Sequence, residues 1–291
     1  MKKFSLTDIS LIGVAIVWAL NFSVIKTALQ EIDPYSFNAL RYLLAGILLV
    51  STAKLRGFTI MVKREHFWKL LGIGIIGNLV YQMLFIIGLN LTFSANAAVM
   101  LGTIPIWVAL LSQLFTDEKL NRNQVIGITL AFVGVTKIIT GGSNNLSFAS
   151  ETFIGDLIAL MAAISWAIYT ILSKKYLKYY NSTQYSAFMS VIGIITLGAV
   201  GLPFLVKVDF TQVSAIGYGG LLYSGLLSVG IAYLIWNHGI IKIGAVRTAM
   251  YQNLVPVLGV IFGVFILDEA LTILQYIGSG FVILGLVLTR K

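Results

Sequence analysis

Aromatic side chains and one arginine stand well inside long apolar stretches of this sequence. They are Trp18, Tyr81, Trp107, Trp166, Tyr169, Tyr233 and Trp236, together with Arg41. Aromatic faces stack on aromatic ligands and attract ammonium groups. A charge inside a membrane-crossing stretch costs about 2.5–3.5 kcal/mol, so it usually faces a cavity or a partner. We interpret these residues as the lining of a binding site for a small solute, in which Arg41 attracts a carboxylate.

Each of these residues also has a plainer interpretation. Any single aromatic residue can serve ordinary helix packing, and Arg41 can reach lipid headgroups or brace Glu31 and Asp33. Trp18 and Trp166 are the strongest candidates, because they occupy matching positions in a repeat described below. We expect them on opposite walls of a central cavity.

Amide side chains and prolines form a second set inside the same stretches. The amides are Asn21, Gln82, Asn96, Asn237, Gln252 and Asn253. For most of them we expect hydrogen bonds between helices, which are worth about 0.6–2 kcal/mol in a bilayer. Asn253 is the one we place in the site, because Pro256 breaks the helical ladder three residues later and frees backbone carbonyls. Pro105 and Pro256 are interpreted as paired hinges, with static kinks as the alternative.

The composition indicates what kind of elements position these side chains. The chain has 291 residues, of which 58% are hydrophobic and 11% charged, and its mean hydropathy is +0.93. Soluble domains carry about 25% charged residues, so this chain has too few charges to cover a surface in water. The net charge of +9 does not indicate a nucleic-acid partner, because the basic residues lie in short segments between apolar runs. The expected partner is the lipid bilayer.

Polar and turn-forming breaks divide the chain into ten apolar segments. They cover residues 9–30, 36–54, 69–91, 95–115, 123–140, 154–173, 182–205, 214–238, 246–267 and 271–289. Each has about the 20 residues that a helix needs to cross a bilayer. We predict an all-α membrane protein of ten transmembrane helices, with an uncleaved first span.

The distribution of basic residues predicts the orientation. If the ten segments all cross the bilayer, 16 of the 20 Lys and Arg residues lie on the side of the N-terminus. The remaining four are Lys26, Arg41, Lys137 and Lys207. Cytoplasmic loops carry the excess of Lys and Arg, so both termini are expected in the cytoplasm.

The two halves of the chain repeat each other. Asp8, Trp18-Ala19 and Lys26 recur 148 residues later as Asp156, Trp166-Ala167 and Lys174. Pro105, Asp117-Glu118 and Gln124-x-x-Gly127 recur 151 residues later as Pro256, Asp268-Glu269 and Gln275-x-x-Gly278. Each half has five spans, an odd number, so the second half enters the membrane upside down. We predict two inverted repeats, residues 1–141 and 142–291, an arrangement that supports alternating access.

The repeat motifs resemble a known family. Arg41-Tyr42, Asn96-Ala97-Ala98 through Pro105 to Glu118-Lys119-Leu120, and Tyr251-x-Asn253-Leu254-x-Pro256 to Glu269-x-Leu271 resemble the EamA repeat of the drug/metabolite transporter superfamily. The resemblance implies a basket-like bundle that moves metabolites across a bacterial cytoplasmic (inner) membrane, similar to the YddG-type aromatic amino-acid exporters. The second copy has no Arg or Lys where Arg41 would fall, so any basic contact in the cavity is expected to be asymmetric.

Several motifs of other functional classes are missing from the sequence. It contains no phosphate-binding loop, no His-Glu-x-x-His and no Cys, so no cofactor, metal site or enzymatic activity is expected. All acidic residues fall in loops or near span ends, which disfavours proton coupling through a buried acid. We predict a carrier of amino acids, aromatic or otherwise zwitterionic, with export favoured. An importer, a channel and a membrane-embedded non-transport protein are the alternatives. A monomer suffices, because two fused halves can enclose a cavity.

Overall fold

The computed structural model describes residues 5–92, 94–116, 119–142, 152–267 and 272–289, and all regular secondary structure in these residues is helical. The first half contains α1 (Leu6–Ala28), α2 (Pro34–Leu55), α3 (Arg64–Gly74), α4 (Tyr81–Leu91), α5 (Ser94–Gly102), α6 (Ile104–Phe115) and α7 (Arg122–Gly142). The second half contains α8 (Phe153–Tyr176), α9 (Ser182–Leu205), α10 (Ala215–Leu222), α11 (Ala232–Ile243), α12 (Ala245–Met250), α13 (Leu254–Leu267) and α14 (Ile273–Thr289).

Three short segments of other helical geometry join some of these helices. The π-helical turns η1 (Ile75–Val80) and η2 (Tyr223–Ile231) connect α3 to α4 and α10 to α11. The 3₁₀ turn η3 (Tyr251–Asn253) connects α12 to α13. In these turns the backbone groups still form hydrogen bonds within the helix. The changed number of residues per turn rotates the side chains that follow to a different face.

Eight helical segments of the described residues are long and apolar enough to cross a bilayer. α14 is a shorter apolar helix of 17 residues, and η3 interrupts the segment from α12 to α13. The prediction of an all-helical membrane protein is confirmed. The third expected span, 69–91, begins earlier, at Arg64, because Glu65 in the first turn of α3 favours helix at that end.

Short polar side chains start the long helices where the sequence breaks between apolar runs. Ser5 and Asp8 form a capping box at the beginning of α1. Asp33 accepts hydrogen bonds from two backbone N–H groups of α2, whose first residue is Pro34. Asn181 caps α9 in the same way. Because no water is available inside a bilayer, these caps belong at the ends of the spans.

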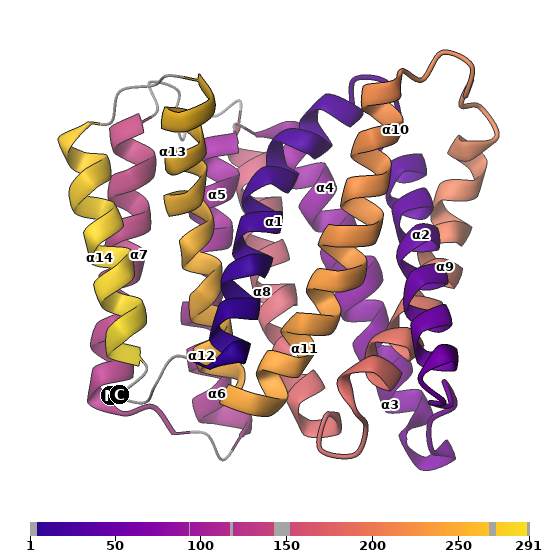
Figure 1. The fold of residues 1–291 in the computed structure, drawn as a ribbon, viewed down its shortest axis with the longest axis horizontal. Helices are drawn as coiled ribbons and strands as arrows, with labels where there is room; N and C mark the ends of the chain where they lie inside the picture. The colour runs from indigo at the N-terminus through magenta and orange to yellow at the C-terminus, as the bar shows by residue number, and fades with distance from the viewer. Residues whose placement is uncertain (1–4, 93, 117–118, 143–151, 268–271, 290–291) are drawn as a thin grey trace.

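The helices of the two halves interlock rather than forming separate bundles (Figure 1). α2 packs against α9, and α7 packs against α14. α1 packs on α11 and α13 of the second half, while its counterpart α8 packs on α4 and α6 of the first. These reciprocal contacts are those of two halves related by a pseudo-two-fold axis. The start of α1 and the end of α14 lie at the same end of the bundle (Figure 1), which we call the terminal end.

Two pairs of glycines set the close antiparallel contact of α7 and α14. A Cβ atom at Gly127 would lie 2.6 Å from the carbonyl oxygen of Gly285, and one at Gly134 would lie 2.6 Å from that of Gly278. Since Gly127 and Gly134 are the repeat counterparts of Gly278 and Gly285, the same contact is used twice. The order of the pairs along the two helices shows that α7 and α14 run in opposite directions. Small residues of this kind let helices approach closely in a membrane.

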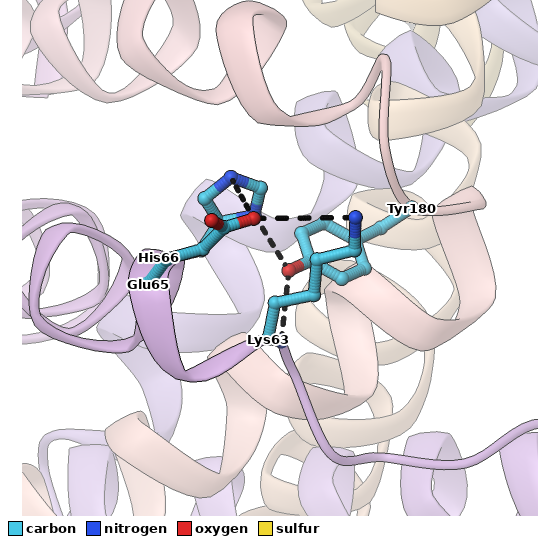
Figure 2. Close-up of polar contacts among 4 residues, drawn as sticks. All are labelled: Lys63, Glu65, His66 and Tyr180. Atoms are coloured by element: carbon cyan, nitrogen blue, oxygen red, sulfur yellow. Dashed lines mark hydrogen bonds and ion pairs between the residues drawn. The ribbon is translucent and has the colours of Figure 1, made fainter.

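A histidine and a tyrosine join the two halves near the terminal end (Figure 2). The Tyr180 hydroxyl lies 2.8 Å from Nδ1 of His66 and accepts a hydrogen bond of 3.1 Å from the backbone N–H of Lys63. Glu65 stands on the other side of the imidazole, 3.6 Å from Nε2. The connection between α2 and α3 is therefore anchored to the turn after α8.

Gly278→Val should destabilise the protein, because the new side chain would collide with the backbone of α7. Overpacking of this kind costs about 1–3 kcal/mol, so we expect a clear drop in the midpoint of thermal unfolding in detergent. Gly280→Val is the matched control on the same helix, because nothing lies within 4 Å of a Cβ at Gly280. Equal stability of the two variants would contradict the close α7–α14 contact.

Candidate functional site: an aromatic cluster and a buried arginine between the two halves

Six of the seven aromatic residues picked out from the sequence form one cluster in the middle of the bundle. They are Trp18 of α1, Tyr81 of α4, Trp166 and Tyr169 of α8, and Tyr233 and Trp236 of α11. Trp166 is the centre of this aromatic cluster. Its ring centroid lies 4.7–6.1 Å from those of the other five residues, and its side chain is 1% exposed.

The expectation that Trp18 and Trp166 line opposite walls is wrong. Their rings touch edge to face, with centroids 6.1 Å apart, and the Trp18 indole N–H donates to the backbone oxygen of Ser228 at 3.1 Å. The two tryptophans occupy matching positions on α1 and α8. Residues that lie close to a pseudo-two-fold axis meet across it, instead of standing apart on either side of a cavity.

A cavity adjoins the aromatic cluster between the two halves. Its empty space is about 690 Å³, a figure that includes the part open to the outside. Of the residues picked out from the sequence, those in its lining are Trp18, Arg41, Tyr81, Tyr233 and Pro256. The rest of the lining is Asn21, Phe22, Gln82, Phe85, Ala98, Leu101, Gly102, Ile104, Ser228, Val229, Gln252 and Val255.

The aromatic cluster lies between this cavity and the terminal end. α8 and α11 both run toward that end (Figure 1), and Tyr169 and Trp236 come after Trp166 and Tyr233 along these helices. Further toward the terminal end, the Tyr251 hydroxyl donates a short hydrogen bond to Asp8, which ties η3 to α1. The cavity is therefore closed on the terminal side by packed rings and by a buried polar contact.

Arg41 is buried at the edge of the cavity, with only 1% of its side chain exposed. Nη1 donates to the Ser224 hydroxyl at 3.1 Å and Nη2 donates to the Gln82 amide oxygen, while Nε has no hydrogen-bond partner. The guanidinium carbon lies 5.7 Å from the centroid of the Phe37 ring. Within the described residues no carboxylate lies within 4 Å of the guanidinium. Arg41 is thus a buried cation held only by neutral groups.

Gln82 connects the arginine to the aromatic cluster. Its amide nitrogen donates to the hydroxyls of Tyr233 at 2.5 Å and of Tyr42 at 3.1 Å. Tyr42 in turn donates to Asn78 at 3.0 Å. Gln82 follows η1 and Tyr233 follows η2, at positions 151 residues apart, so this is a second contact between matching positions of the two halves. The π-helical turns, which often mark functional sites, direct both side chains inward.

Some residues picked out from the sequence stand away from the cavity. Trp107 is half-buried on α6 and donates to the Thr103 hydroxyl of its own helix at 3.1 Å. Asn253 is buried in η3, with its amide nitrogen 4.0 Å from the sulfur of Met250. Pro105 is buried at the start of α6, whereas Pro256 lines the cavity. Helix breaks precede both prolines, at Thr103 and at η3.

Sequence reasoning assigned most amides to helix packing, and this assignment missed three of them. Asn237, which donates to Ser186 at 2.9 Å, does hold helices together. So does Asn78, an amide that was not picked out from the sequence, which donates to the Met189 backbone oxygen at 2.8 Å. Asn21, Gln82 and Gln252 instead line the cavity. The pattern that could have revealed them is their spacing from an aromatic residue or from a proline. Asn21 lies three residues after Trp18, Gln82 directly follows Tyr81, and Gln252 precedes Pro256 by four.

A multi-pass helical bundle with an aromatic and polar cavity between two interlocking halves is the architecture of a membrane carrier for small solutes. The chain belongs to the EamA-like transporter family, whose pattern matches residues 5–140 and again residues 153–290. The resemblance seen in the sequence is therefore confirmed, and with it membership of the drug/metabolite transporter superfamily.

Similar proteins are found across the whole length of the chain. The uncharacterized transporter YyaM of Bacillus subtilis is 30% identical over 95% of this chain and 91% of its own length. A probable amino-acid metabolite efflux pump of Escherichia coli is 27% identical over 94% of this chain and 91% of its own length. A crystal structure of 18% sequence identity covers 96% of both chains with a TM-score of 0.80, which shows that the fold is shared.

Trp166→Ala should lower the free energy of unfolding by about 3–5 kcal/mol, the range for removing a fully packed large aromatic side chain. Trp107→Ala is the matched control and should cost less than half as much, because Trp107 is only half-buried whereas Trp166 is fully buried. Denaturation by SDS in mixed micelles measures both values. A Trp107 variant as unstable as the Trp166 variant would mean that the cluster is not the centre of the packing.

Proposed function

We propose that this protein is a secondary transporter of amino acids and related zwitterionic metabolites in a bacterial cytoplasmic membrane. Ten transmembrane helices in two inverted repeats move the solute by alternating access, and export is the direction of net transport. The observation that carries the proposal is Arg41, because it is a buried cation beside a cavity and has no carboxylate partner among the described residues. A carboxylate brought by a solute would supply that partner.

The aromatic residues next to Arg41 support a solute with an apolar side chain. Trp18, Tyr81 and Tyr233 present ring surfaces to the same cavity, and ring stacking contributes about 0.5–1.5 kcal/mol beyond the area buried. Relatives from Escherichia coli and Salmonella typhimurium are named as probable amino-acid metabolite efflux pumps. Both names support an amino-acid substrate and the export direction for this chain.

The charge of the terminal end supports a cytoplasmic location for it. Lys54, Arg56, Lys63 and Arg64 lie at or near the connection between α2 and α3, and Lys174, Lys175 and Lys178 at the turn after α8. All of these connections are at the terminal end (Figure 1). By the positive-inside rule this end faces the cytoplasm. The aromatic cluster then closes the cavity on its cytoplasmic side, as in an outward-facing or occluded state of a carrier.

Arg41→Met should strongly slow amino-acid counterflow in liposomes without unfolding the protein. Hydrogen bonds to charged groups are worth about 1.5–3 kcal/mol, so the transport rate at low substrate should fall at least about tenfold. The removed burial cost of the charge offsets the two lost hydrogen bonds, which keeps the variant folded. Arg41→Lys keeps the charge and loses the planar fork, and should be intermediate.

Lys26→Met is the matched control for this experiment, because Lys26 is an exposed cation of α1. It should transport within about twofold of the wild type, as expected for an exposed charge. Counterflow of radiolabelled Phe, Tyr, Trp and Met measures all the variants. A folded Arg41→Met variant with wild-type counterflow would refute the carboxylate site.

Export predicts that cells producing the protein accumulate less labelled amino acid than cells producing Arg41→Met. Such cells should also tolerate a toxic analogue, p-fluorophenylalanine, at higher concentrations. An importer on the same scaffold gives the opposite result in both assays, with more accumulation and greater sensitivity. The two directions are thereby separated in intact cells, where the natural gradients and orientation are present.

A further inference from the structure

The cavity lining carries a positive charge that no negative charge among its described residues balances. Its lining contains one cation, Arg41, and within the described chain none of the lining residues is acidic. An amino acid, the solute of the proposed function, brings an ammonium group as well as a carboxylate. The ammonium group needs hydrogen-bond acceptors or ring faces when it leaves water, so the cavity must hold groups of this kind if it is to take zwitterions.

Two amide side chains in the lining have unused hydrogen-bonding capacity. The buried oxygens of Asn21 on α1 and Gln252 on η3 have no hydrogen-bond partner, and neither amide makes a hydrogen bond with the described residues. A half-turn about the last side-chain bond exchanges the oxygen and nitrogen of an amide, so each group can present its oxygen to the cavity. A buried carbonyl without a partner costs about 1–3 kcal/mol, so packing alone does not account for the pair.

Two prolines leave backbone carbonyls of cavity-lining residues without their usual helical donor. Pro105 and Pro256 have no N–H group and cannot donate to the carbonyl four residues earlier. The residues at those positions are Leu101 and Gln252, and both line the cavity. Carbonyls at the broken helices of transporters commonly coordinate cations. The lining thus contains side-chain acceptors on α1 and η3, and two residues at helix interruptions whose carbonyls lack the proline N–H.

We propose that Asn21 and Gln252, with the carbonyls freed by Pro105 and Pro256, bind the ammonium group of the solute while Arg41 binds its carboxylate. This inference rests on the proposed function and adds the residues that select zwitterions over simple carboxylates. Neutral amides suit the task better than an acid would. A carboxylate beside Arg41 in a medium of low dielectric constant would pair with the guanidinium and occupy the site of the solute.

The first experiment compares amino acids with analogues that lack one charge, using the wild-type protein in liposomes. Counterflow of labelled Phe is inhibited by unlabelled Phe, 3-phenylpropionate or phenethylamine. Met with 4-(methylthio)butanoate and Trp with indole-3-propionate are the equivalent pairs for the other substrates. We expect the des-amino acids to need at least about tenfold higher concentrations for half-inhibition, as expected for the loss of charge-assisted hydrogen bonds.

The second experiment removes the acceptors. Asn21→Leu and Gln252→Leu should each raise the half-inhibitory concentration of Phe about tenfold, as expected for one charge-assisted bond, and leave that of 3-phenylpropionate within about twofold. A merely structural role would shift both inhibitors together. Gln30→Leu is the matched control, because Gln30 is exposed after the end of α1, and it should change neither value.

The outcomes separate the inference from the proposed function. Phe and 3-phenylpropionate inhibiting equally in the wild type would overturn the ammonium site and leave the carboxylate site standing. Leu variants in which the half-inhibitory concentrations of Phe and 3-phenylpropionate rise in parallel would also overturn the ammonium site. Absence of counterflow for every amino acid, in liposomes where another solute is transported, would overturn the proposed function together with the inference. If both Leu variants fail to fold, the wild-type comparison alone decides.

Discussion

The centre of this protein depends on one constraint, which is that matching positions of its two halves meet each other. Trp18 contacts Trp166, and Gln82 donates a hydrogen bond to Tyr233. At the edge of the bundle the matching helices α7 and α14 contact each other, and their glycine contact occurs in two symmetric copies. A side chain near the pseudo-two-fold axis must therefore pack against its own counterpart, and large flat rings meet this requirement because they contact one another edge to face.

The polar chemistry of the cavity arises where the two halves differ. By the repeat spacing, the counterpart of Arg41 is Met189, that of Asn21 is Tyr169 and that of Gln252 is Leu101. A symmetric pair of arginines beside one cavity would repel each other at low dielectric constant. Each of these three residues is present in only one of the two matching positions, Arg41 and Asn21 in the first half and Gln252 in the second, so the two sides of the cavity differ. The helices that the two halves share determine the shape of the cavity. The positions at which the halves differ determine the direction in which a dipolar solute would be held.

The sequence picked out all six residues of the aromatic cluster, but as the lining of a cavity, and only Trp18, Tyr81 and Tyr233 line it. Trp166, Tyr169 and Trp236 could be recognised because aromatic residues at the middle of a span lie outside the interfacial belts. The meeting of Trp18 with Trp166 required the axis position, which spacing alone does not contain. Trp107 was placed in the site although it stands apart, because lipid-facing and protein-facing sides of a membrane helix are both apolar. The helical period that separates buried from exposed faces in soluble proteins is therefore weak here.

The amides show most clearly which polar groups serve the fold and which serve the cavity. Asn78 and Asn237 each donate to a partner on another helix, and in a bilayer such bonds hold helices together. Asn21 and Gln252 make no such bond, and Arg41 retains an unpartnered Nε. Each of these groups lowers the stability of the bundle as it stands. Buried polar groups that make a fold less stable, and that gather around one cavity, are best explained by a ligand that satisfies them.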